Sequence, residues 1–296
     1  MLPADVLRQV RRLHIRSRRV VQTVLGGEYH SAFKGVGLSF EDVREYQPGD
    51  DVRTIDWNVT ARTGQAYIKR FVEERELTII LAVDVSASQK FGTGSLVKRA
   101  VAAELAALLA LCAVSNNDRV GLMAFTEEVE RFVPPNKGPR HALRLLRDIL
   151  ASEPKKPGTD LRVALDYLNK VQRRRAIVFL LSDFLSTGFE EAFRRASRKH
   201  DLIAVRMSDP REGDWPAAGL VRLEDAESGR QMVIDTSSRA FREGFAARSR
   251  DRLAAFTKLA RGSQADLVEV GTDGTHFDAL LGFFRKRERR RSGGRG

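Results

Sequence analysis

The sequence predicts an α/β protein of the Rossmann type, with a doubly wound, mostly parallel sheet flanked by helices. From residue 77 onward, continuous apolar runs alternate with segments of helical periodicity. Continuous apolar runs are typical of strands that are buried on both faces, and this alternation is typical of parallel sheets. The chain has 296 residues, which is enough for such a domain and a smaller attachment.

An amphipathic helix is predicted at the N-terminus, within residues 1–27. Apolar residues between Asp5 and Leu25 follow helical spacing, and arginines occupy the opposite face. Gly26-Gly27 is expected to end this helix.

Residues 28–76 are predicted to form a β-rich segment, because they lack helical periodicity. The run Gln47-Pro48-Gly49-Asp50-Asp51 is a strong turn signal. The segments around Leu38–Phe40 and Tyr67–Val72 have the composition of strands that could pair. We interpret the mixed charges beside Trp57 as a structural ion-pair network.

The main domain is predicted to span residues 77–286. A β-hairpin is expected as an insertion at about residues 217–236, and we expect it to pack against residues 28–76. The final residues, 287–296, are expected to form a basic tail without regular structure. Strands are predicted at 77–83, 118–125, 129–133 (ended by Pro134-Pro135), 176–181, 202–206 and 266–270, and helices at 97–114, 141–150, 161–171, 189–199, 238–261 and 277–286.

Composition limits the classes of protein that fit. Cys112 is the single cysteine, so an internal disulfide is impossible and a reducing compartment is expected. We see no signal peptide, and the longest apolar stretch, Leu105–Val114, is shorter than the roughly 20 residues that span a bilayer. We therefore expect a cytoplasmic protein without an integral membrane segment.

The net charge of +12 is concentrated at the two ends of the chain. Basic ends of this kind can contact nucleic acid or an anionic membrane surface. No aromatic residues for base stacking interleave with the arginines of the tail, however, so a solvated tail is the simpler interpretation. We do not expect nucleic acid to be the main partner.

Polar side chains follow two of the predicted buried strands, where each strand ends. Asp84, Ser86 and Ser88 form the pattern Asp-x-Ser-x-Ser after the first strand, and Asp183 follows the strand at 176–181. Ligand sites of open α/β sheets lie at this carboxyl edge. If the two strands are neighbours, Asp84 and Asp183 lie about 5 Å apart and repel unless one is protonated or a cation bridges them. The simpler interpretation is a strand-end Asp with two loop serines that cap the next helix.

Hydroxyl and carboxylate oxygens are the ligands that Mg²⁺ or Mn²⁺ prefers over zinc. A third loop, Gly158-Thr159-Asp160, precedes a predicted helix, and Thr159 or Asp160 is expected to cap that helix. These loops together suggest a site for a divalent cation.

These motifs resemble a known domain. Together they look like a von Willebrand factor A domain. The motifs are Asp84-x-Ser86-x-Ser88, Thr159 in Gly-Thr-Asp, Asp183 in Leu-Leu-Ser-Asp and the run Asp118-Arg-Val-Gly-Leu-x-Ala-Phe. The resemblance implies a metal-ion-dependent adhesion site. In it, Ser86, Ser88 and Thr159 would supply hydroxyl ligands, while Asp84 and Asp183 would bind directly or through water.

Residues 40–67 narrow the resemblance to one family of proteins. This part is similar to the bacterial domain-of-unknown-function 58 family. The similarity lies in the run Phe40-Glu-Asp-Val-Arg-Glu-Tyr-Gln-Pro-Gly-Asp-Asp-Val-Arg-Thr-Ile-Asp-Trp57, followed by Ala61-Arg62 and Tyr67. Members of that kind are often encoded beside MoxR-type AAA+ ATPases, so the resemblance implies such an ATPase as partner. It implies a non-enzymatic, metal-dependent interaction module in which an acidic residue of a partner or client completes the coordination of the metal.

Two other functions stay open at this point. Asp84 could be the nucleophile of a Mg²⁺-dependent phosphotransferase or hydrolase. Against this, no histidine lies in the three candidate loops, and Gly92-Thr93-Gly94-Ser95 lacks the ending of a phosphate-binding loop. The basic ends could instead attach the protein to nucleic acid or to an anionic membrane, and such binding would depend strongly on salt.

Overall fold

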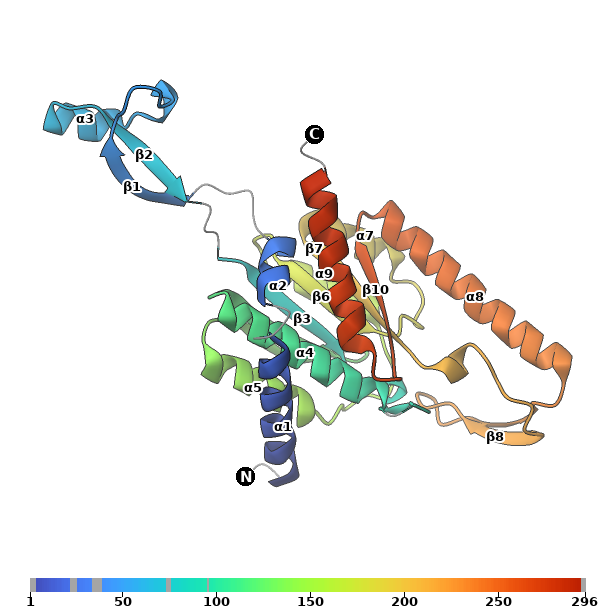
Figure 1. Ribbon diagram of the computed structural model, residues 1–296. Helices are drawn as coiled ribbons and strands as arrows, with labels where there is room; N and C mark the ends of the chain where they lie inside the picture. Colours follow the sequence, from blue (N-terminus) through green and yellow to red (C-terminus); the bar gives the residue numbers. More distant parts are fainter. Residues whose placement is uncertain (1–3, 22–25, 34–38, 73–75, 95, 294–296) are drawn as a thin grey trace. The chain divides into compact units, whose positions relative to one another are not determined.

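The computed structural model describes residues 4–21, 26–33, 39–72, 76–94 and 96–293 (Figure 1). The chain divides into two compact units. The large unit contains Met1–Ala32 and Thr78–Gly296, and the small unit contains Phe33–Leu77. Among the described helices, none combines the length and apolarity needed to cross a membrane.

The large unit is built on a six-stranded sheet with the order β10-β7-β6-β3-β4-β5. Five neighbouring strands are parallel, and only the edge strand β5 runs antiparallel to its neighbour β4. The predicted doubly wound, mostly parallel sheet is therefore confirmed. The strands are β3 (Thr78–Asp84), β4 (Arg119–Phe125), β5 (Val129–Asn136), β6 (Ile177–Ser182), β7 (Asp201–Ser208) and β10 (Asp266–Gly271).

The edge strand β5 differs from the prediction, because Pro134-Pro135 lies inside it instead of ending it. Proline cannot donate a hydrogen bond to a neighbouring strand, and an edge strand tolerates this. Gly121 of β4 makes the close approach possible: a Cβ atom there would lie 2.9 Å from the nitrogen of Pro135.

Helices cover both faces of the sheet. On one face, α6 (Leu161–Val171), α7 (Glu190–Lys199) and α8 (Arg239–Gly262) contribute to one buried apolar cluster with alternate residues of the central strands. On the other face lie α4 (Lys98–Ser115), α5 (Pro139–Leu150) and α9 (His276–Gly293) (Figure 1). The strands are apolar at nearly every position because both of their faces are buried.

The N-terminal helix α1 (Ala4–Val20) packs against α4 and α5 of the large unit. Its predicted end needs correction. The helix ends at Val20, and Gly26-Gly27 lies in the first turn of a second helix, α2 (Gly26–Phe33), that the sequence analysis did not predict.

The prediction of a basic tail without regular structure also needs correction, because α9 continues through residues 287–293 and ends at Gly293. Arg287 forms ion pairs with Asp201 and with Asp266, the latter at 2.6 Å, and Arg290 also pairs with Asp266. These acids start β7 and β10, so the tail arginines meet complementary charge at the end of the sheet. The prediction failed because that charge is distant in the sequence.

The small unit contains the predicted antiparallel pair of strands, β1 (Ser39–Glu45) and β2 (Tyr67–Val72). Leu38 lies outside the described residues. The connection holds a short 3-10 helix, η2 (Val52–Thr54), and α3 (Trp57–Thr63), which was not predicted. Arg44 and Asp50 form a bidentate ion pair, in which the shorter contact joins Arg44 Nη2 and Asp50 Oδ1 at 2.7 Å.

The inserted hairpin consists of β8 (Leu220–Glu224) and β9 (Gln231–Asp235), which form a separate antiparallel sheet. We expected it to pack with residues 28–76, but it belongs to the large unit. Its tip is held there by a hydrogen bond to the loop before α6, described below.

Candidate metal-ion site at the sheet edge

The candidate site lies where the order of the strands reverses, between the neighbouring parallel strands β3 and β6. Asp84 is the last residue of β3, and Asp183 directly follows β6. The register pairs Val83 with Leu181, so both strands deliver their acids to the same edge. Ligands of open α/β sheets bind in the crevice at such a point.

Asp84 is fully buried, and its partners come from both strands. Its carboxylate accepts hydrogen bonds from the hydroxyl of Ser182 at 2.7 Å and from the backbone N–H of Ser86 at 3.0 Å. Burial, and next the charge of Asp183, raise the pKa of Asp84 to about 7. The site therefore holds an acid whose ionised form lacks enough compensation from the protein.

The oxygen atoms of Ser86, Ser88 and Asp183 form a continuous chain of contacts. The two serine hydroxyl oxygens are 3.1 Å apart, and Ser88 donates to Asp183 Oδ2 at 2.9 Å. The amide nitrogen of Gln89 lies 3.2 Å from Asp183 and 3.4 Å from Asp84. One amide group thus contacts both carboxylates, which confirms that the two strand-end acids are close neighbours.

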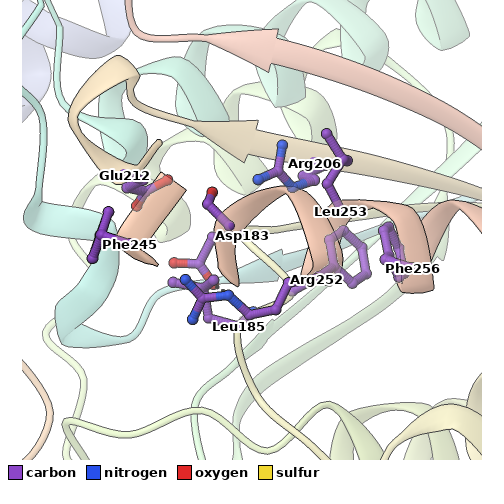
Figure 2. A pocket seen from close by; sticks show the side chains of 10 residues that line it. Asp183, Leu185, Arg206, Glu212, Phe245, Arg252, Leu253 and Phe256 are labelled. Carbon is purple, nitrogen blue, oxygen red and sulfur yellow. Dashed lines mark hydrogen bonds between the residues drawn. The ribbon is translucent and has the colours of Figure 1, made fainter. Parts of the chain in front are cut away.

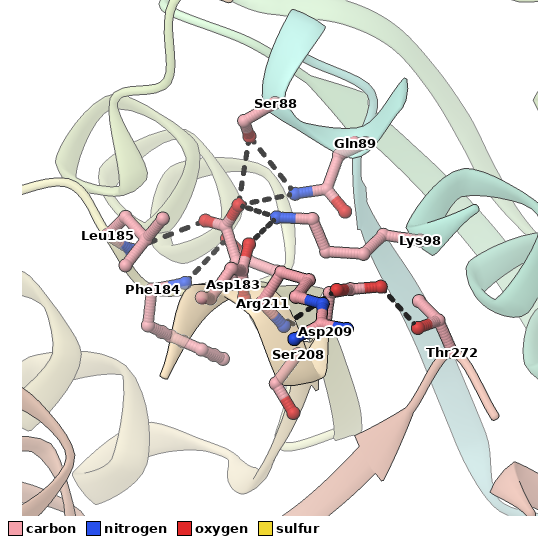
Figure 3. Close-up of polar contacts among 12 residues, drawn as sticks. Ser88, Gln89, Lys98, Asp183, Phe184, Leu185, Ser208, Asp209, Arg211 and Thr272 are labelled. Atoms are coloured by element: carbon pink, nitrogen blue, oxygen red, sulfur yellow. Dashed lines mark hydrogen bonds and ion pairs between the residues drawn. The ribbon is translucent and has the colours of Figure 1, made fainter. Parts of the chain in front are cut away.

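Lys98 supplies the positive charge of the cluster (Figure 3). Its ammonium group is 1% exposed and lies 2.7 Å from Asp183 Oδ2 and 2.6 Å from Glu212 Oε1. Burial alone would lower the pKa of Lys98, but Asp183 and Glu212 outweigh it, so the pKa is raised. Lys98 is therefore held charged at the rim of the site.

Thr159, the fifth predicted ligand, lies in the adjacent loop. Ala87 donates its backbone N–H to the carbonyl of Pro157, which ties this loop to the one that carries Ser86 and Ser88. Asp160 caps α6 through its side chain, so the Thr159 hydroxyl is not needed as the cap. It donates instead to Glu227 at 3.0 Å. The structure joins the other four predicted residues by hydrogen bonds but describes no such bond from them to Thr159, and all five stay predicted ligands.

The donor set fits a hard divalent cation. In an octahedral Mg²⁺ shell with bonds of 2.0–2.1 Å, neighbouring ligand oxygens lie about 3 Å apart, which is the spacing of Ser86, Ser88 and Asp183 here. Asp84, Asp183 and Glu212 carry three potential negative charges against Lys98, so a divalent cation would balance the cluster. No three His, Cys, Asp or Glu side chains of the described residues gather as a metal cluster, so a cation here would depend on the serine hydroxyls.

A cavity of about 230 Å³ adjoins the site and shares Asp183 with it (Figure 2). Phe184 and Phe256, whose rings stack at 4.2 Å, contribute to its apolar lining, and Arg206 and Arg252 line it with guanidinium groups. Phe184 has a φ of 55°, a left-handed conformation that is strained for a bulky residue. Such strain directly after Asp183 indicates that the loop is shaped by the site and its cavity.

Several residues of the site were missed from the sequence. Ser182 stands beside Asp183 in the quoted motif, but a strand pattern does not show which hydroxyl faces Asp84. Lys98 opens an apolar helix, and a buried cation at that place is a signal that could have been noticed. Glu212 completes the capping box Asp209-Pro-Arg-Glu212, a signal for a helix start that does not reveal its contact with Lys98, and Glu227 lies in a surface turn.

Comparison with known proteins shows which family this chain resembles. A family model described as "Protein of unknown function DUF58" matches residues 42–255. An uncharacterized protein of Mycobacterium tuberculosis is 34% identical over 286 residues, which cover 95% of this chain and 89% of the relative. The uncharacterized protein YeaD of Bacillus subtilis is 28% identical over 62% of this chain and 43% of its own length.

Solved structures with a similar arrangement include two proteins of low sequence identity. The conserved hypothetical protein BatB from Bacteroides thetaiotaomicron is 19% identical, covers 72% of this chain and 99% of its own, and has a TM-score of 0.47. The VWA domain of SpRpn10 is 13% identical, covers 69% of this chain and 93% of its own, and has a TM-score of 0.37.

Proposed function

This chain belongs to the DUF58 family, and we propose that it is a non-enzymatic module that binds a protein partner through a divalent cation, Mg²⁺ or Mn²⁺. The observation that carries the proposal is the convergence of Asp84, Ser86, Ser88 and Asp183 at the point where the strand order reverses. These four residues would hold the cation, with Thr159 as a further hydroxyl ligand.

A bound cation would supply positive charge and a coordination position that an acidic side chain can fill. Metal and partner would then each raise the affinity of the site for the other. The cavity beside Asp183 supports this proposal, because a side chain next to the partner's acid could pack against its apolar lining.

The proposed partner is a MoxR-type AAA+ ATPase or one of its clients, with this chain acting as an adaptor or co-chaperone. This part rests on the motifs of residues 40–67 that resemble the family. In this proposal the pair works in the cytoplasm, as expected from the single cysteine.

Two rival functions gain no support from the contacts. His141, His200 and His276 bind to Val120, Ala176 and Glu104, respectively, and none is recorded in contact with Asp84 or Asp183. Among the side-chain contacts that the structure describes, none would give a hydrolase that uses Asp84 a histidine base. Attachment through the basic tail gains no support either, because three arginines at this end of the chain, Arg285, Arg287 and Arg290, pair with acids of the same chain.

The test combines metal binding with partner capture. We expect the wild-type protein to bind Mn²⁺ in calorimetry and to capture a MoxR-type AAA+ ATPase only when Mg²⁺ is present. Asp84→Asn should abolish both, because it removes a carboxylate from the site while keeping its shape. Asp251→Asn, at an exposed position of α8, is the matched control. Capture that persists in EDTA and in Asp84→Asn would refute the proposal.

A further inference from the structure

The tip of the β8–β9 hairpin directs an acidic side chain to the candidate site. Asp225 closes the turn, since its Oδ1 atom accepts from the N–H of Glu227 at 3.1 Å and of Ser228 at 2.7 Å. Gly229 completes the turn with a φ of 67°. Glu227 lies inside this closed turn, so the hairpin and not a flexible loop determines its position.

Glu227 contacts the site through Thr159, whose hydroxyl donates to Glu227 Oε1 at 3.0 Å. A second carboxylate, that of Glu127, packs against Gly158, the neighbour of Thr159. Within the described part of the chain, no Lys or Arg forms an ion pair with Glu227. The carboxylates of Glu127 and Glu227 thus flank the loop that carries Thr159, and a bound cation there would reduce their repulsion.

The rest of the hairpin is held weakly. Its two strands pair with each other, and Leu220, Met232 and Val233 are 75%, 55% and 63% exposed. Little apolar area would therefore return to water if the hairpin moved away from the sheet edge. The acidic tip is the part of the hairpin that has a defined polar contact with the site.

We propose that Glu227 is the internal acidic ligand of this site. It would occupy, from within the same chain, the position that an acidic residue of the partner takes. The inference rests on the proposed function, and it adds a mode of regulation: a partner must displace the β8–β9 hairpin before its own carboxylate can bind. The site would thus recognise a glutamate or aspartate presented on a tight turn, since that is what its internal ligand imitates.

The experiment uses the full chain and the metal alone. Mn²⁺ affinity is measured by calorimetry, and amide hydrogen exchange of residues 225–230 is followed with and without Mg²⁺. In the wild type, Mg²⁺ should slow exchange at the hairpin tip several-fold. In Glu227→Gln, this protection should disappear, and Mn²⁺ should bind about tenfold more weakly, equivalent to about 1.4 kcal/mol.

Glu224→Gln is the matched control, because Glu224 is an exposed acid on the same hairpin whose carboxylate accepts from the side-chain amide of Gln231 at 3.0 Å. It should keep both the wild-type affinity and the protection. If Glu227→Gln matches the wild type in both measurements while Asp84→Asn loses Mn²⁺, the internal ligand is refuted and the proposed function survives. If the wild type binds no Mn²⁺ at all, both are refuted.

Discussion

Two buried acids at the same edge of the sheet meet opposite electrostatic conditions. Asp84 ends β3, and Asp209 follows β7, and both are almost completely buried. The pKa of Asp84 is raised to about 7 by burial and by Asp183. Burial also acts to raise the pKa of Asp209, but hydrogen bonds from Thr272 and Thr93 outweigh it and lower the pKa to about 2.

The difference arises from the donors that each carboxylate receives. Asp209 accepts from the backbone and the hydroxyl of Thr93 at 2.7 and 2.6 Å, from Thr272 at 2.6 Å and from the N–H of Arg211 at 2.9 Å. It joins three loops and has no need of an added cation. Asp84 accepts from Ser182 and Ser86 but shares the Gln89 amide with Asp183, so its charge is less fully compensated. A buried acid can therefore be compensated by its neighbours or can favour a cation, and the donors around it decide which.

Lys98 and Glu212 connect the two regions. Glu212 accepts from Lys98 through one oxygen and from the backbone N–H of Asp209 through the other. The ammonium of Lys98 also contacts Asp183. The Lys98 side chain thus supplies positive charge at Asp183, in the candidate site, whereas its partner Glu212 belongs to the Asp209 region.

The largest effect is expected from Lys98→Met. The substitution leaves Asp183 and Glu212 without their common cation, and breaking a buried ion pair in this way costs about 3 kcal/mol. Urea unfolding in EDTA should show this loss. Excess Mg²⁺ should recover part of it, because a divalent cation at the site replaces the missing charge.

Lys258→Met, on the exposed side of α8, serves as the control and should change stability little. An equal loss of stability for Lys98→Met in EDTA and in Mg²⁺ would show that Lys98 and a cation are not interchangeable. The Asp183 region would then resemble the purely structural Asp209 region.

A slightly smaller effect is expected from Asp209→Asn. The amide accepts fewer hydrogen bonds and leaves donors of Thr93 and Thr272 unpaired in a buried place, which costs roughly 2–3 kcal/mol. The loss should be the same with and without Mg²⁺ when it is measured by urea unfolding. A loss that Mg²⁺ removes would mean that Asp209 belongs to the metal site, and it would end the distinction drawn above.

The smallest effect is the pH dependence of the metal-free protein. An acid whose pKa is raised on folding binds its proton more tightly in the folded state. Stability is therefore highest below the unfolded pKa of about 4, and it declines as the pH rises through about 7. The full shift corresponds to an upper limit of about 4 kcal/mol, and we expect roughly half of that because Lys98 is close.

Unfolding in urea at about pH 5 and about pH 8, in EDTA, measures this decline. Asp84→Asn should flatten it, and Asp251→Asn should leave it unchanged. Asp209, whose pKa is lowered to about 2, contributes nothing to the change in this range. A wild-type protein equally stable at both pH values would contradict the raised pKa of Asp84.

The predictable part of the site follows from strand direction. Parallel strands deliver their last residues to one edge, so the apolar runs before Asp84 and Asp183 were enough to bring these acids together. Ser86 and Ser88 lie within four residues of Asp84, so their place at this edge could be predicted together with that of Asp84. A short-range signal also predicted where α6 begins, because the side chain of Asp160 caps the first turn of that helix. Prediction failed at the tail of α9, where Arg287 and Arg290 find acids that start distant strands.

The sequence by itself determined the sheet, its flanking helices and the five proposed ligands. It could do so because burial of both faces of a strand requires continuous apolar runs, and these can be read locally. Only the tertiary structure decided which charges surround those ligands. Lys98 meets Asp183 across 85 residues, and Thr159 meets Glu227 across 68. Such contacts depend on how loops and helices pack at the edge of the sheet, and no local pattern of residues encodes them.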